Sequence, residues 1–164
     1  MGRSLGPVAS MPLGEDDTLA RFTADGFVYE VEKRGDRVFH IEKKLSSDGN
    51  ELFRREAKIS FVIGSGNSGR SYLIEQDGYL VQSPITWFAK DTWQLSPGYE
   101  EFNHHFERQI TPACLFCHSN GVNAAPDARN LYVDDVFTGH AIGCERCHGP
   151  GDLHVRARDE LPEM

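Results

Sequence analysis

Basic residues are too few in this 164-residue chain to form a nucleic-acid-binding surface. Lysine and arginine number 17 against 25 acidic residues, which gives a formal net charge of -8. Contact with phosphate needs a basic face, and the largest basic runs are the pairs Lys43-Lys44 and Arg54-Arg55. We expect both pairs to lie on solvated strand faces, and we expect no nucleic-acid partner.

Long hydrophobic runs are also missing. No apolar stretch approaches the ~20 residues of a membrane-spanning helix, so we expect no membrane span. A secretory signal combines a basic start, an apolar core of roughly 7–15 residues and a small-residue cleavage site, and residues 1–10 supply only fragments of it. The hydrophobic fraction of 39% is still close to that of globular proteins, so most of the chain should fold.

Sulfur is scarce, and its placement is informative. The four cysteines form two five-residue words, Cys114–His118 and Cys144–His148, and each word reads CxxCH. This motif is the attachment signal of c-type haem, in which two thiols add to the vinyl groups of one porphyrin and the adjacent histidine lies beneath the iron. The prediction is two covalently attached haem c groups, bound by Cys114, Cys117, Cys144 and Cys147, with His118 and His148 as proximal iron ligands.

Other chemistries of paired cysteines explain these words less well. A zinc ribbon holds one metal with four thiolates, but it prefers roughly 15–20 residues between its pairs, whereas 26 residues separate Cys117 from Cys144 here. Zinc also leaves His118 and His148 without a role. Thioredoxin-like or disulfide chemistry is a further alternative that leaves both histidines unexplained.

The sixth iron ligand is expected to be histidine, because the only methionines are Met1, Met11 and Met164, all near the ends of the chain. His154 is the favoured candidate, since it follows His148 by six residues, past a Gly-Pro-Gly bend that turns the chain away from its own haem. The remaining candidates are His140, His105 and His40, with His104 behind them.

The pattern of short β-rich runs and glycine turns predicts an α+β fold. Five strands are expected within 27–32, 38–42, 58–63, 71–75 and 79–82, joined as a small antiparallel β meander. The segment 64–69 is glycine-rich, but it matches neither phosphate-loop motif and is expected to be a tight turn. We divide the chain into an irregular lead-in (1–25), the β region (26–95) and a loop-rich, short-helix dihaem cytochrome c segment (96–164), all within one integrated domain.

Local signals also predict the surroundings of the two words. An aromatic loop at 84–99 could wall a flat cofactor or pack in an ordinary core. The pair Thr111-Pro112 predicts the start of a short helix that carries the first word. A surface loop is expected at 119–132, and a second short helix, stopped sharply by Gly149, is expected at the second word.

The run Gly139–Val155, preceded by Ile110–His118, resembles the multihaem c-type cytochrome module that is often fused to tetratricopeptide repeats, which is in turn similar to the tetrahaem cytochrome of the ammonia-oxidation pathway. The similarity extends through 62–66, 82–88 and 95–99. The resemblance implies tightly packed, mostly bis-histidine haems, with His154 as a distal ligand. Such proteins carry further CxxCH words on both sides, so this chain is expected to be a fragment of a longer one.

Electron transfer through covalent haems, as part of a multihaem cytochrome, is therefore the leading functional hypothesis. An electron carrier is favoured over a catalyst. The alternatives are a haem redox enzyme with an open iron site, acting on a small nitrogen or sulfur compound, and a zinc-stapled binding module. Expected partners are redox proteins or further haem domains of the same parent chain. Because haem is joined to CxxCH outside the cytoplasm, we expect a periplasmic or extracellular location.

Overall fold

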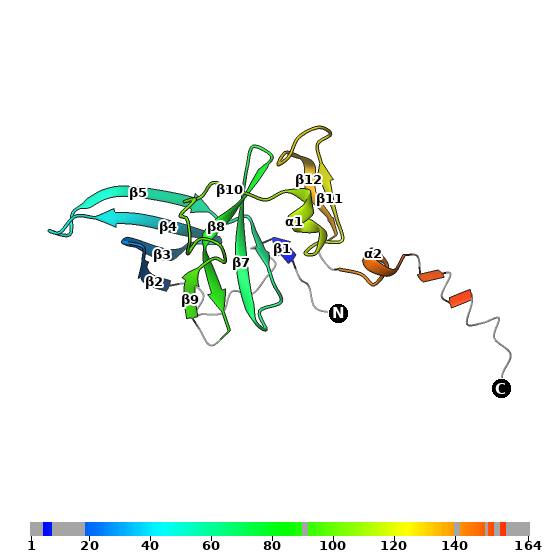
Figure 1. Cartoon of the computed structure of the whole chain (residues 1–164), viewed down its shortest axis with the longest axis horizontal. Coiled ribbons are helices and arrows are strands. Elements are labelled where there is room, and N and C mark those ends of the chain that lie inside the picture. Colours follow the sequence, from blue (N-terminus) through cyan, green and yellow to red (C-terminus); the bar gives the residue numbers. More distant parts are fainter. Residues whose placement is uncertain are drawn as a thin grey trace.

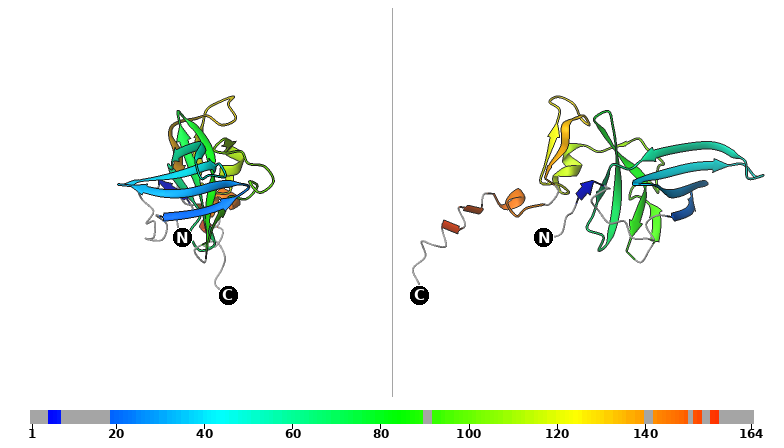
Figure 2. Two further views of the ribbon diagram at one scale, coloured as in Figure 1. Left: turned by 90° about the vertical axis from the view of Figure 1, so that its left-hand side faces the viewer. Right: turned by 180° about the vertical axis from the view of Figure 1, so that it is seen from behind.

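The chain folds mainly as antiparallel β-structure, as a computed structural model shows (Figure 1). The structure describes residues 5–7, 19–89, 92–139, 142–149, 151–152 and 155–156. Within these residues, twelve strands form three sheets, and two short helices lie outside them. The free end of the first sheet and the second helix lie at opposite ends of the molecule, as the view from behind also shows (Figure 2).

The first sheet is a four-stranded meander in which each strand pairs with the next along the chain. Its strands are β2 (Leu19–Ala24), β3 (Phe27–Arg34), β4 (Arg37–Leu45) and β5 (Glu51–Lys58). Asp25 and Gly26, both at positive φ, form the two-residue turn between β2 and β3. Such turns match the twist of the strands they join, and Asp-Gly is a preferred pair there.

The second sheet continues the chain after a crossing at Ile59 and Ser60, whose N–H groups donate to Val38 of β4 and Leu73 of β7 respectively. It is built around the order β1-β6-β7-β8-β10, with β9 pairing β8. Its strands are β1 (Leu5–Pro7), β6 (Phe61–Ile63), β7 (Gly69–Gln76), β8 (Tyr79–Phe88), β9 (Thr92–Leu95) and β10 (Arg108–Gln109).

The main hydrophobic core lies between these two sheets. Tyr29 and Val31 from β3 are in one buried cluster with Tyr72 from β7 and Ile85 from β8. Alternating residues of a strand point to opposite faces, so each sheet contributes one apolar face to this layer. These side chains pack the first sheet against the second sheet.

A second core holds the short hairpin of β11 (Gly121–Ala124) and β12 (Tyr132–Gly139) against the second sheet. Tyr132, Val136 and Phe137 pack there with Leu73 and Leu80. The Tyr132 hydroxyl donates to the carbonyl of Ile110, 2.7 Å away, so its polar end is also satisfied. This hairpin lies beside the first helix, as Figure 1 shows.

The expected α+β fold is wrong. The chain does not change after the β region into a loop-rich, short-helix dihaem cytochrome c segment, because strands continue to Gly139. β10 extends the second sheet. Within 119–132, expected to be a surface loop, β11 and the first residue of β12 are strand, and the rest of the stretch is loop and turn. The physical reason is that β11, β12 and α1 bury their apolar side chains against Leu73 and Leu80 of the second sheet, in a core made of protein side chains.

Smaller expectations had mixed outcomes. Two of the glycine turns expected between strands are found at 34–36 and 76–78. The expected tight turn at 64–69 is instead a five-residue loop (64–68) between β6 and β7. The structure adds β2 within the expected lead-in and β5 between two expected strands. The aromatic segment 84–99 is not a loop, because most of it forms β8 and β9. Tyr99 is fully buried, which is the ordinary core role. Among the described residues, no helix is long and apolar enough to cross a bilayer.

Candidate functional site

The first CxxCH word begins on α1 (Pro112–Phe116), as expected from Thr111-Pro112. Thr111 is the N-cap with extended backbone angles, and Pro112 fits the first turn because its missing N–H would have no helical partner there. Leu115 is the one buried residue of α1 and anchors the helix in the second core. Cys114 and Cys117 are exposed as a result.

The thiol of Cys114 has a polar neighbour within its own helix start. Its Sγ lies 3.4 Å from Oγ1 of Thr111, and this hydrogen bond lowers the pKa of Cys114 below its ordinary value. A lowered pKa increases the thiolate fraction at neutral pH, and the thiolate is the nucleophilic form of cysteine. The contact with Thr111 therefore favours the thiolate form of Cys114.

A cavity of about 240 Å³ opens beside this word. Cys114, His118 and Leu115 line one side, and residues of the second sheet line the other. Four of the lining residues are aliphatic, namely Ile63, Leu73, Ile110 and Leu115. Ligand sites commonly have about 300–1,000 Å³. The cavity thus has room for an apolar edge of a flat cofactor, while the rest of such a group would need walls from elsewhere.

The second word lies on α2 (Glu145–His148), a single turn with no buried residue. Cys144 is its N-cap, and Gly149 ends it at φ 76° and ψ -174°, a conformation essentially confined to glycine. The Oε1 atom of Glu145 accepts a hydrogen bond from the N–H of Gly151, 2.8 Å away. This contact fixes the bend after the second word, and the expectation of a sharply stopped helix is confirmed.

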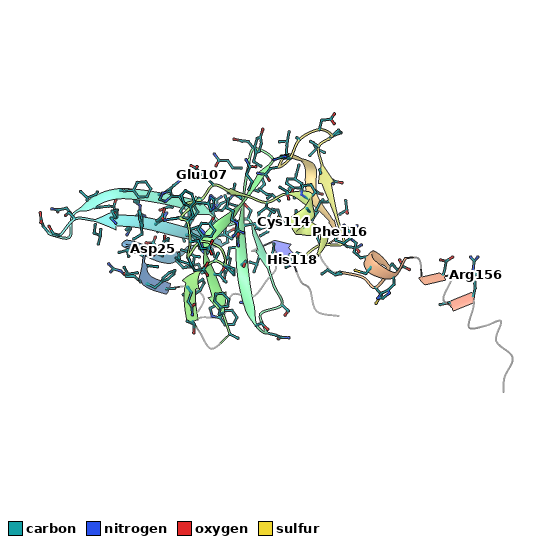
Figure 3. All side chains as sticks on the ribbon, in the orientation of Figure 1. Asp25, Glu107, Cys114, Phe116, His118 and Arg156 are labelled. Carbon is teal, nitrogen blue, oxygen red and sulfur yellow. The ribbon has the colours of Figure 1, made fainter. Side chains whose placement is uncertain are left out.

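A contact between side chains joins the two words. The guanidinium carbon of Arg146 on α2 lies 4.3 Å from the ring centre of Phe116 on α1, a cation–π geometry. Figure 3 shows Cys114, Phe116 and His118 together at α1. The Nε atom of Arg146 is buried, without a hydrogen-bond partner among the described residues. Arg146 and Phe116 each stand directly before the second cysteine of their word.

His40 is a core residue of β4. It is fully buried, with Nδ1 2.7 Å from Oγ of Ser83, and its ring packs edge-on against Tyr72. Burial lowers the pKa of His40 to about 3, so the ring is neutral at physiological pH. It does not line the cavity beside Cys114. The structure thus places this candidate iron ligand in the main core, in the role of a hydrogen-bonded core histidine.

His105 lies at the first sheet instead. Its Nδ1 is 2.6 Å from Oε2 of the fully buried Glu42, and its ring contacts Phe27 and Phe53. His104 packs against Tyr99 and Phe102 nearby. The structure therefore does not bring these candidates into the cavity of the first word. The other two candidates, His140 and His154, lie outside the described residues.

The donor set of each word fits a covalently attached haem. All four thiols are free and exposed, and each pair is followed directly by an exposed histidine, His118 or His148. Cysteines three positions apart on a helical turn lie on one side of it, as two neighbouring vinyl groups require. Within the described part of the chain, no three His, Cys, Asp or Glu side chains gather as a metal site.

Sequence reasoning missed Thr111 as the partner of Cys114 and Arg146 as the partner of Phe116. The first had a local signal, since Thr111 is one helical turn before Cys114. The second had only the matching positions of Phe116 and Arg146 within their words. Comparison of the chain with protein-family models, with curated proteins and with solved structures finds no match.

Proposed function

We propose that this protein transfers electrons through two covalently bound c-type haems, as part of a multihaem cytochrome. The observation that carries the proposal is that both CxxCH words present free, exposed thiols on short helical turns whose side chains touch each other through Arg146 and Phe116. Two attachment words in contact suit transfer between neighbouring centres more than storage at a single centre. The haem iron would supply the one-electron chemistry.

The chain's own residues would bind and shield the groups. Cys114 and Cys117 would hold the first group beside the cavity, where Leu115 and Leu73 would cover part of its edge. Cys144 and Cys147 hold the second group on α2, which has no buried residue. His118 and His148 would ligate the iron of their respective words. The second group is consequently the more exposed to solvent among the surroundings that the structure describes.

The proposed setting is the periplasm or the cell exterior, because haem is joined to CxxCH words there. Redox proteins, or further haem domains of a longer parent chain, are the proposed partners. The weak protein cover of α2 supports this, since an electron carrier needs one centre close to the surface that its partner meets. The net charge of -8 favours a partner with a basic docking face.

The test is to express the full chain in a host with haem-maturation machinery and to count haems by pyridine haemochrome assay and intact mass. We expect two haems per chain, and one in the double variant Cys114→Ala/Cys117→Ala. His104→Gln, an exposed histidine outside both words, is the matched control and should keep two. A colourless protein that contains zinc would refute the proposal. High-spin spectra with carbon monoxide binding would instead identify the open-site haem enzyme.

A further inference from the structure

The residue at the junction of the two words has no role in haem attachment as such. Arg146 is neither a thiol nor an iron ligand, yet it makes the cation–π contact from α2 to α1. α1 is fixed by Leu115 in the second core, whereas α2 has no buried residue of its own. The position of the second word relative to the first therefore depends on the contact between Arg146 and Phe116.

We propose that Arg146 is a positioning residue shared by both sites, which sets the spacing of the two words and places one positive charge beside both. The inference rests on the proposed function and deepens it. Its structural half needs no haem, because the contact with Phe116 exists in the protein alone. Its electrostatic half follows from the location of Arg146, which belongs to the second word and lies over the Phe116 ring of the first.

Arginine suits this place better than an aliphatic residue. Guanidinium is always charged, and it stacks on aromatic faces while keeping its N–H groups for other acceptors. The buried Nε–H of Arg146 has no acceptor among the described residues, and buried donors in proteins are normally satisfied. A porphyrin carries two propionate carboxylates, and arginine is the preferred partner of carboxylates. The unpartnered donor thus points to an acceptor of this class.

A fixed positive charge opposes the oxidised, more positive state of an iron centre nearby. Since Arg146 neighbours both words, its charge should raise the reduction potentials of both sites. A residue that acted within the second word alone would affect the second site alone. This difference separates a shared role from a local one.

The spacing is tested in the full apo chain, with Cys114→Ser and Cys144→Ser, by nitroxide labels on Cys117 and Cys147. Arg146→Ala should lower the ratio of the close to the separated label population by about fivefold, the equivalent of a cation–π contact of about 1 kcal/mol. Phe116→Ala should have the same effect, and the double variant should add little. Arg146→Lys, which keeps a cation, should restore most of the close population. An unchanged distribution in Arg146→Ala would overturn the spacing role.

The charge is tested by redox titration of the haem-loaded chain. Arg146→Ala should lower both midpoint potentials, and Arg146→Lys should keep them close to those of the parent. A shift of one potential only would overturn the shared role. A chain that takes up no haem would refute the proposed function and the electrostatic half together, while the label measurement would still decide the contact.

Discussion

The Nδ1 atom of His105 lies 2.6 Å from Oε2 of Glu42, a carboxylate with no exposed surface. The same carboxylate accepts hydrogen bonds through Oε1 from the hydroxyl of Tyr29 at 2.8 Å and from the amide of Asn103 at 2.6 Å. Burial, followed by the nearness of Glu42, raises the pKa of Tyr29 above its usual range, so the hydroxyl remains a donor. The loop that leads to β10 is thereby fastened to the first sheet.

Glu42→Gln should destabilise the protein by about 1–3 kcal/mol, because the donors around a buried carboxylate lose their charged acceptor. Urea unfolding followed by tryptophan fluorescence measures this. Glu101→Gln changes an exposed carboxylate in the same loop and should stay within about 0.5 kcal/mol of the parent. Equal midpoints for the two variants would show that the Glu42 network does not stabilise the fold.

His40 should make the protein less stable as the pH falls. Burial lowers the pKa of His40 to about 3, while the ring in the unfolded chain has its ordinary value of 6.5. Between these two values the His40 ring binds a proton in the unfolded chain but not in the folded chain. The contribution of His40 to the free energy of unfolding is therefore fully present above pH 6.5 and falls below it, by up to about 1.4 kcal/mol per pH unit.

The measurement is the free energy of unfolding between pH 7 and pH 5 for the parent and for His40→Leu. The variant should lose this part of the pH slope, whatever its absolute stability. His104→Gln removes an exposed histidine and should retain the slope. A parent and a His40→Leu variant with parallel pH profiles would mean that His40 is protonated in the folded state.

Local patterns predicted turns well and long-range contacts not at all. Arg34–Asp36 and Gln76–Gly78 are turns because glycine there adopts positive φ between alternating apolar runs. Asp25-Gly26 carries the same signal and indicates a strand before it, which is β2. The pattern of β5 does not predict a strand, because five of its eight residues are charged, as is common in an edge strand.

The functional surroundings depend on residues far apart in sequence. Phe116 and Arg146 are 30 positions apart, and Glu42 and His105 are 63 apart. No spacing rule within one helix or strand joins such pairs, since they meet only once the sheets have packed. The CxxCH words themselves were readable because their chemistry is contained in five consecutive residues.

Thr111→Val should slow the alkylation of Cys114 by roughly fivefold at pH 7, the equivalent of one hydrogen bond of about 1 kcal/mol. The Thr111 hydroxyl lowers the pKa of Cys114, and its loss should raise that pKa and reduce the thiolate fraction. Thr111 makes no side-chain capping bond, so the start of α1 should persist. Iodoacetamide labelling followed by peptide mass spectrometry gives the alkylation rates of Cys114 and Cys147 in one sample. Cys147 should keep its rate, and equal slowing of both thiols would contradict the local cause.

Gly149→Ala should open the bend after the second word, because φ 76° with ψ -174° strains any residue with a Cβ atom. Among the residues that the structure describes, a Cβ atom at Gly149 would meet nothing within 4 Å. We therefore assign the effect to the backbone, at about 1–3 kcal/mol or roughly 5- to 150-fold in a local equilibrium. The N–H of Gly151, held by Glu145, should exchange with deuterium faster by a factor in that range.

Gly143→Ala is the matched control on the other side of the second word. Its φ is not positive, and the one described atom that its Cβ atom would contact is Oδ1 of Asn120 at 3.7 Å, so exchange at Gly151 should not change. Equal exchange in both variants would show that the bend does not depend on the conformation of Gly149.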